Sequence, residues 1–208
     1  MTETASTAVP AGPATTAGTW HLDPKSTTIQ FHTKAMWGMA KVNGTFSAIS
    51  GSGIVGDQGA IAGELVVDAT SIDTKNKRRD KHLRGADFFD VSKYPTLSFS
   101  ASEVIPSGDG TLKIKGALRI KDQAQTIELV ATPSYASPDR VTLNGEATID
   151  RSRWGMTWKM GGAWLVNRVV VGAQFVRSYP RGHPSRRHAY PCRRSLAITT
   201  LWIWLVPS

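Results

Sequence analysis

Apolar and charged residues alternate with a period of two over long stretches of this chain, and no other feature of the sequence constrains the fold as strongly. The clearest example is segment 112–121, which reads LKIKGALRIK. In an extended strand, its Leu and Ile residues fall on one face and its Lys and Arg residues on the other. The pattern therefore predicts strands with one apolar face.

The same alternation recurs through the middle of the chain, beginning with Ile29 and Phe31. Further pairs are Leu65 and Val67, Leu97 and Phe99, Ile127 and Leu129, Val141 and Leu143, and Ala147 and Ile149, and the last run is 167–176. Turn residues separate these runs, so about eight strands are expected, antiparallel because most connections are too short for crossovers. Asn43-Gly44 and Asn144-Gly145 are assigned as turns, with bulges inside long strands as the alternative.

One segment, 75–84 (KNKRRDKHLR), breaks the alternation and predicts a short helix. Asp73 or Thr74 can cap its start, and Gly85 is placed to adopt the left-handed conformation after its last turn. One-sided strands with a single helix favour a mainly β fold, an eight-stranded antiparallel barrel that is closed or nearly closed.

The two ends of the chain differ from its middle. Residues 1–18 are mostly Ala, Thr, Pro and Gly and predict a disordered leader, whereas residues 19–178 predict the barrel. Residues 179–208 form a basic, Pro-rich tail whose apolar end, 196–206, is too short to span a bilayer as a helix. The leader lacks the basic start and apolar stretch of an export signal, so a cytoplasmic protein without a transmembrane segment is expected.

Most of the net charge of +9 lies in two places. The tail holds five arginines and no acid, and segment 75–84 holds six basic residues and one acid. Solvated surface charge is the first interpretation; nucleic-acid or anionic-surface binding through this segment and the tail is the alternative. No aromatic residue interleaves with the basic residues of 75–84, so no specific nucleic-acid partner is expected.

The inward faces of the predicted strands carry aliphatic and aromatic residues. An eight-stranded barrel can enclose one small ligand, and such a lining would suit a long hydrocarbon chain, unless the side chains simply fill the barrel. Tryptophan and methionine would make the lining adaptable. The candidate lining residues are Phe31, Trp37, Phe46, Leu65, Val67, Leu97, Phe99, Ile114, Leu118, Ile127, Leu129, Ile149, Trp154, Trp158 and Phe175.

Polar residues gather on the predicted helix. Arg79, His82 and Arg84 are the candidates for a cavity mouth, where they would meet an anionic or quinone head group. A helix that is simply hydrogen-bonded to the barrel is the plainer alternative.

Motifs for catalysis and metal binding are weak in this sequence. We find no phosphate-binding glycine loop, nucleophile elbow or pair of catalytic carboxylates, and the single cysteine, Cys192, excludes a multi-cysteine metal site. No catalytic residue, metal or required cofactor is therefore predicted. An enzyme acting on a hydrophobic small molecule stays an alternative.

Segment 71–95, SIDTKNKRRDKHLRGADFFDVSKYP, resembles the YceI family, as do WHLDPKS at 20–26 and IDRSRWGMTW at 149–158. The resemblance covers residues 19–178. It implies an extended, lipocalin-like barrel that binds polyisoprenoid lipids, including isoprenoid quinones, in its interior. It also implies a binding protein without catalytic activity, whose lipid partner is carried, stored or sensed. A homodimer is left open.

Overall fold

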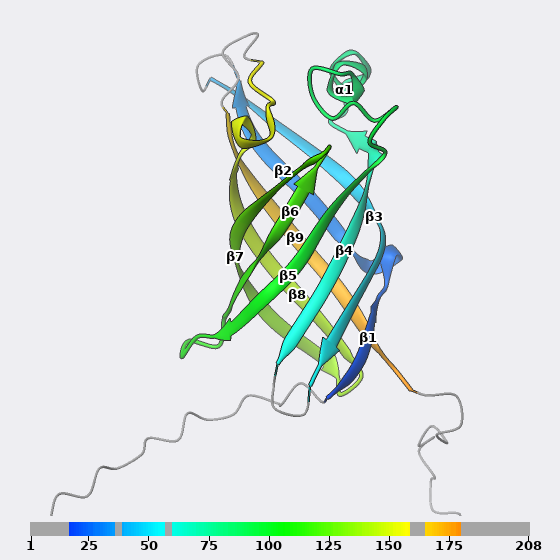
Figure 1. Cartoon of the computed structure of the whole chain (residues 1–208), viewed down its shortest axis with the longest axis vertical. Helices are drawn as coiled ribbons and strands as arrows, with labels where there is room; N and C mark the ends of the chain where they lie inside the picture. The colour runs from blue at the N-terminus through cyan, green and yellow to red at the C-terminus, as the bar shows by residue number, and fades with distance from the viewer. Residues whose placement is uncertain (1–16, 36–38, 57–59, 159–164, 180–208) are drawn as a thin grey trace, which may run out of the picture. The chain divides into compact units, whose positions relative to one another are not determined.

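The computed structural model describes residues 17–35, 39–56, 60–158 and 165–179. Within these ranges the chain forms nine β-strands, the helix α1 (Lys77–Arg84) and the short 3₁₀ helices η1 (Pro24–Ser26) and η3 (Arg151–Trp154) (Figure 1). The strands are β1 (Gly18–Leu22), β2 (Thr28–Ala35), β3 (Ala40–Val55), β4 (Ile61–Asp73), β5 (Thr96–Pro106), β6 (Leu112–Ile120), β7 (Gln123–Ser137), β8 (Arg140–Asp150) and β9 (Val166–Ser178).

All strand pairs are antiparallel, and the pairing of β3 with β4 closes the sheet into a barrel. Both β1 and β2 pair with β3 on one side and β9 on the other, so they share one position in the wall. The break between them is η1, where Pro24 starts the turn and Asp23 accepts hydrogen bonds from the Lys25 N–H and the Ser26 hydroxyl. Nine strands therefore build the eight-stranded antiparallel barrel that the alternation predicts.

The two Asn-Gly pairs are not turns, so that assignment is wrong. The alternative is right in placing both pairs inside long strands, but neither pair forms a bulge. Asn43 and Gly44 lie within β3 and pair in regular register with β2, and Asn144 and Gly145 lie within β8. At Gly44 the reason is close packing: a Cβ atom there would overlap the ring of Phe31 on the neighbouring strand. Glycine here makes room for an aromatic ring instead of bending the chain.

The helix α1 covers one end of the barrel, at the top of Figure 1, and β1 begins at the other end. The N-cap of α1 is Asn76, whose side chain accepts a hydrogen bond from the Arg79 N–H, and Gly85 after the helix has φ −73°. The expected caps Asp73 and Thr74 and the left-handed Gly85 are therefore wrong. Asp73 binds Lys75 instead, and Thr74 donates to Asp80.

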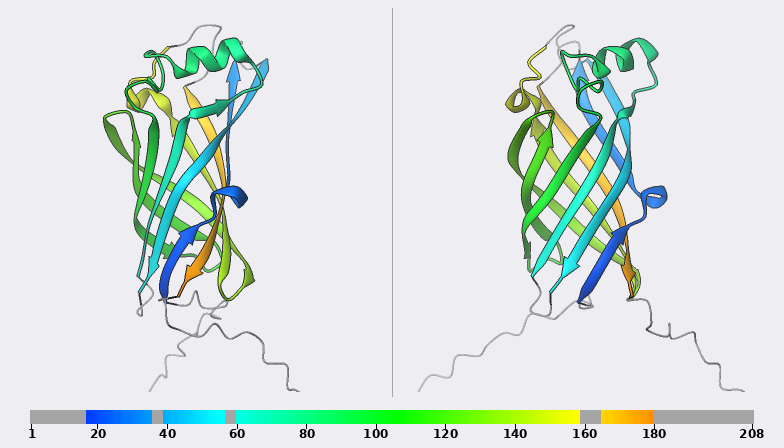
Figure 2. Two further views of the ribbon diagram at one scale, coloured as in Figure 1. Left: turned by 90° about the vertical axis from the view of Figure 1, so that its right-hand side faces the viewer. Right: turned by 45° about the vertical axis from the view of Figure 1, so that its right-hand side comes forward.

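Two clusters of buried residues lie toward the two ends of the barrel, which Figure 2 shows from the side. The larger cluster includes Phe88, Trp154 and Met156 near α1. The smaller consists of Trp20, Val55 and Val141 near the end where β1 begins. We call the end of the barrel near α1 the helix end, and the end where β1 begins the terminal end.

Most of the predicted leader and tail, residues 1–16 and 180–208, lies outside the described residues, and their assignments stay predictions. The barrel itself begins with β1 at Gly18, one residue before the predicted boundary. In the described part of the chain, no helix is long and apolar enough to cross a membrane.

Candidate functional site

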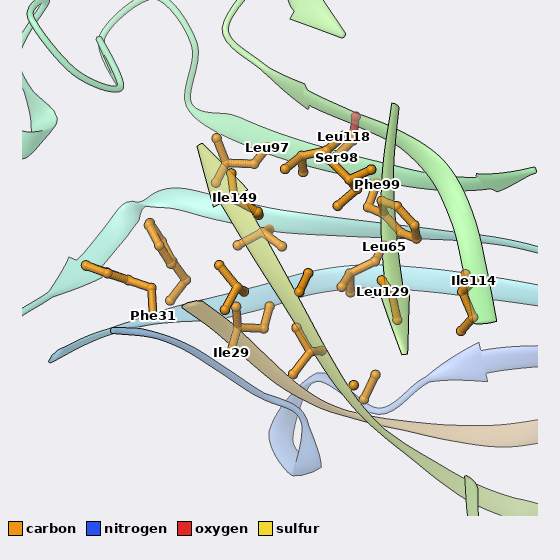
Figure 3. Close-up of a pocket in the computed structure, with 18 of the residues that line it drawn as sticks. Ile29, Phe31, Leu65, Leu97, Ser98, Phe99, Ile114, Leu118, Leu129 and Ile149 are labelled. Carbon is orange, nitrogen blue, oxygen red and sulfur yellow. The ribbon is translucent and has the colours of Figure 1, made fainter. Parts of the chain in front are cut away.

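A cavity of about 450 Å³ lies inside the barrel. Figure 3 shows Ile29, Leu65, Phe99 and Leu129, from four different strands, reaching into this common space. The volume falls within the roughly 300–1,000 Å³ of ordinary ligand sites. An apolar cavity of about 150 Å³ holds one benzene, so on that scale this one accommodates about 18 carbon atoms. The barrel is thus not filled by its own side chains.

Most of the candidate lining residues lie on the wall of this cavity. They are Phe31, Phe46, Leu65, Val67, Leu97, Phe99, Ile114, Leu118, Ile127, Leu129, Ile149, Trp158 and Phe175. Trp37 lies outside the described residues. Trp154 does not line the cavity: it is 1% exposed, and its indole N–H donates to the Leu118 carbonyl at 3.2 Å. Whether the wall residues contact a lipid stays a prediction.

Several wall residues were not among the candidates. Some lie on strand faces that the alternation already indicates or continues, but they were not included in the list of candidates: Ile29, Val42, Ala131, Ala147, Val169, Val171 and Ala173. Others had no clear periodic signal. Arg151 and Met156 lie in or just after η3, and Trp20 lies in β1, which has only five residues.

The three candidates for the mouth take different positions. Arg79 and His82 line the cavity at the helix end, whereas Arg84 is not among the lining residues. The Arg84 guanidinium donates to the carbonyls of Thr70 and Ile72 and so fixes α1 to β4. The Arg79 guanidinium also donates two hydrogen bonds to Thr74, one to its hydroxyl oxygen and one to its carbonyl oxygen. Arg84 thus only hydrogen-bonds the helix to the barrel, as the plainer alternative describes. Arg79 both fixes the helix and faces the cavity.

His82 belongs to an aromatic cluster that links α1 to the segment after η3. Its ring lies edge-on to Trp158, with centroids 4.2 Å apart, and edge-on to Phe88 at 5.2 Å. Its Nε2 lies 3.5 Å from the Asp87 carboxylate. Two segments far apart in the sequence therefore meet at the helix end through ring contacts.

Arg151 is a buried cation on the cavity wall, 7% exposed. It donates to the carbonyls of Met156 and Trp158, and its guanidinium lies 5.2 Å from the Phe88 ring centroid. Burial lowers the pKa of this guanidinium, and the neighbouring Asp150 carboxylate opposes that effect. Arginine stays protonated in proteins, so the helix end carries a fixed positive charge that also positions Trp158.

The site is an apolar cavity with a polar, cationic end. Within the described ranges, no three His, Cys, Asp or Glu side chains are grouped so that they could hold a metal ion. The pKa of Asp150 is lowered by hydrogen bonds from Ser152, and that of Glu146 by its hydrogen bond from Arg168. Both are partners in local structure that hold the ends and wall of the barrel together.

The sequence model of the YceI-like domain family matches residues 20–176. The chain belongs to this family. A UPF0312 protein of Pseudomonas aeruginosa is 30% identical over 156 residues, which cover 72% of this chain and 81% of that protein. A UPF0312 protein of Vibrio cholerae is 36% identical over 96 residues, and the chain spans about half the length of this relative (51%).

Solved structures share the fold at lower identity. BcnA of Burkholderia cenocepacia has a TM-score of 0.64 and 22% identity, over 74% of this chain and 98% of BcnA. A polyisoprenoid binding domain from Saccharophagus degradans has a TM-score of 0.60 and 13% identity, over 76% of this chain and 98% of that one. At such identities these likenesses establish the YceI-like fold alone.

Two of the three YceI-like motifs build the helix end of the barrel, and the third contributes Trp20 to the terminal end and η1 to the wall. Motif 20–26 supplies Trp20 and η1, motif 71–95 supplies α1, and motif 149–158 supplies Arg151 and Trp158. The motifs therefore combine cavity residues with residues that fix the local backbone.

Asp80 shows how strongly motif 71–95 is fixed. The carboxylate is 6% exposed and accepts from both the N–H (2.9 Å) and the hydroxyl of Thr74. Asp80→Ala leaves both donors unsatisfied, and each buried unsatisfied group costs about 1–3 kcal/mol. We expect the free energy of unfolding, measured in urea, to fall by about 3 kcal/mol. The exposed neighbour Lys81→Ala should change it by less than about 0.5 kcal/mol, and equal effects of the two substitutions would contradict this role.

Proposed function

We propose that this YceI-like chain binds a polyisoprenoid or isoprenoid-quinone lipid inside its barrel, as a binding protein and not as an enzyme. The observation that carries the proposal is the closed barrel around a 450 Å³ cavity whose wall is almost entirely aliphatic and aromatic. The YceI-like relative from Saccharophagus degradans, described as a polyisoprenoid binding domain, supports this ligand class. No cofactor is required for such a role.

The size of the cavity sets the expected affinity. Burial of about 18 carbons at about 0.8 kcal/mol each gives a gross gain of about 14 kcal/mol. Association itself costs about 4–15 kcal/mol, so net binding is much weaker than full burial implies. A lipid can therefore enter and leave, as carriage or sensing requires.

The polar end of the lipid is proposed to lie at the helix end of the cavity. Arg79, His82 and Arg151 gather there, and a head group rich in oxygen would accept hydrogen bonds from them. The opposite end is packed by the apolar residues Val55 and Val141. The cationic side chains of the cavity wall therefore gather at the helix end, where the head group is proposed to lie.

Native mass spectrometry of the purified full chain tests the proposal. We expect a co-purifying prenyl lipid, identified after organic extraction, or a one-to-one complex after incubation with a quinone carrying three or four isoprene units. The fluorescence of the indoles should change on binding, and Trp158→Phe should remove part of that change because Trp158 lines the cavity.

A protein that carries no lipid and stays ligand-free after incubation would overturn the proposal. Salt-sensitive binding of anionic vesicles or nucleic acid would then favour the alternative, in which the exposed Lys77, Arg78 and Lys81 of α1 contact an anionic surface.

A further inference from the structure

Two buried polar side-chain atoms among the described residues lack a hydrogen-bond partner, Trp20 Nε1 and Thr33 Oγ1. Both residues line the cavity. Native proteins leave few buried polar groups unsatisfied, and each such group needs an explanation. Because both residues line the same cavity, a ligand bound there offers one explanation for both atoms.

The two atoms belong to opposite ends of the barrel. Trp20 lies opposite Gly53 and Thr33 opposite Val42, and these partners are eleven residues apart along β3. At about 3.4 Å per residue that separation is about 37 Å along the strand. Thr33 therefore belongs to the helix end and Trp20 to the terminal end.

The indole N–H of Trp20 reaches none of the acceptor side chains on the cavity wall. The residue is 3% exposed and packs with Val55 and Val141, together with the partly buried hydrophobic residues Ile61, Leu143 and Phe175. These side chains are hydrocarbon, and the indole N–H can only donate. Trp154 shows that this fold satisfies an indole that serves packing alone, since its N–H donates to the Leu118 carbonyl.

We propose that the Trp20 indole N–H donates a hydrogen bond to an oxygen of the bound lipid at the terminal end of the cavity. The preferred ligand is then an isoprenoid whose chain carries a carbonyl or hydroxyl oxygen at the end away from the head group, and not one whose chain is pure hydrocarbon. This inference rests on the proposed function and makes Trp20 a specificity-determining residue within it.

Thr33 is the competing position. Its hydroxyl can rotate and can both donate and accept, and it lies near the polar groups of the helix end. The indole of Trp20 is rigid, can only donate and is 3% exposed, so it has fewer ways to be satisfied than a hydroxyl, which is why the proposal assigns the lipid oxygen to Trp20.

The test compares two probes, the C18 prenyl ketone farnesylacetone and the hydrocarbon in which a methylene replaces its carbonyl oxygen. The wild-type chain should bind the ketone roughly ten-fold more tightly or better, since the ketone satisfies a buried donor. Trp20→Phe keeps an aromatic ring but removes the donor, so this preference should disappear. Thr33→Val, nearly equal in shape to threonine, should keep the preference ratio.

A second readout does not depend on the variants. In the wild-type chain, the indole N–H proton resonance of Trp20 should shift downfield with the ketone and much less with the hydrocarbon. Equal binding of both probes, or a preference abolished by Thr33→Val but not by Trp20→Phe, would overturn the assignment to Trp20. Failure of both probes to bind would count instead against the proposed function.

Discussion

Replacing Gly116 with alanine is expected to destabilise the barrel by about 3 kcal/mol, the upper end of the usual cost of overpacking. A Cβ atom at this buried position would overlap the Ser100 carbonyl oxygen and lie 2.7 Å from the Phe99 ring. The first contact is with backbone in the paired strand β5, which cannot rotate away. Next to it, β5 is irregular between Ala101 and Glu103, so the glycine lies opposite a bulge.

Urea unfolding followed by circular dichroism measures this effect as a lower midpoint at an unchanged slope. Gly53→Ala is the matched control, because its Cβ would have 3.8 Å to its nearest neighbours within a strand of the same barrel. We expect this control to be neutral or slightly stabilising, since alanine reduces the entropy of the unfolded chain. Comparable losses in both variants would show that strand glycine itself, and not the contact with Ser100, sets the cost.

The fold is predictable because its determinants are local and repeated. The strand 112–120 alternates so regularly that its inward face follows from period two, and the cavity indeed receives Leu112, Ile114, Leu118 and Ile120. Closure of the barrel adds long-range pairing, yet it changes none of these faces. The lining residues on long strands therefore follow from the alternation of the sequence.

The site residues that the sequence misplaces or misses are those whose position depends on a specific tertiary contact. Trp154 and Trp158 are four residues apart in one motif, yet Trp154 turns to the Leu118 carbonyl and Trp158 to the cavity. Arg151 lies buried because two carbonyls of the same loop and the ring of Phe88 receive it. No periodicity encodes such contacts, since η3 and the following residues form no regular strand.

The strand glycines also show that local sequence does not reveal tertiary contacts. Asn43-Gly44 has the composition of a hairpin turn, but Phe31 of β2 lies over Gly44 and the strand continues. A turn requires glycine for its backbone conformation, whereas close packing requires it because it has no side chain. The sequence alone does not distinguish them, because the aromatic residue involved lies on another strand.

Replacing Gly145 with leucine is expected to weaken prenyl-lipid binding at least ten-fold while leaving the barrel folded. Gly145 lines the cavity between Ala131 of β7 and Val171 of β9, and without a side chain of its own it leaves room at this level of the wall. A Cβ atom there would meet Leu129 Cδ1 at 3.1 Å, the movable end of a side chain, and Ala131 Cβ at 3.6 Å. The rest of the leucine would then occupy space that the lipid is proposed to fill.

Stability and binding should therefore change in opposite directions. Filling an apolar cavity commonly adds about 0.5–2 kcal/mol, so the lipid-free variant should unfold at the same or a higher urea concentration than the wild-type chain. Binding is measured by fluorescence titration with farnesylacetone. Val130→Leu, at a neighbouring position that is 45% exposed, adds apolar volume outside the cavity and should leave both quantities unchanged. A folded Gly145→Leu variant that binds the ketone as tightly as the wild-type chain would show that the lipid does not occupy this level of the barrel, because two groups cannot fill the same volume.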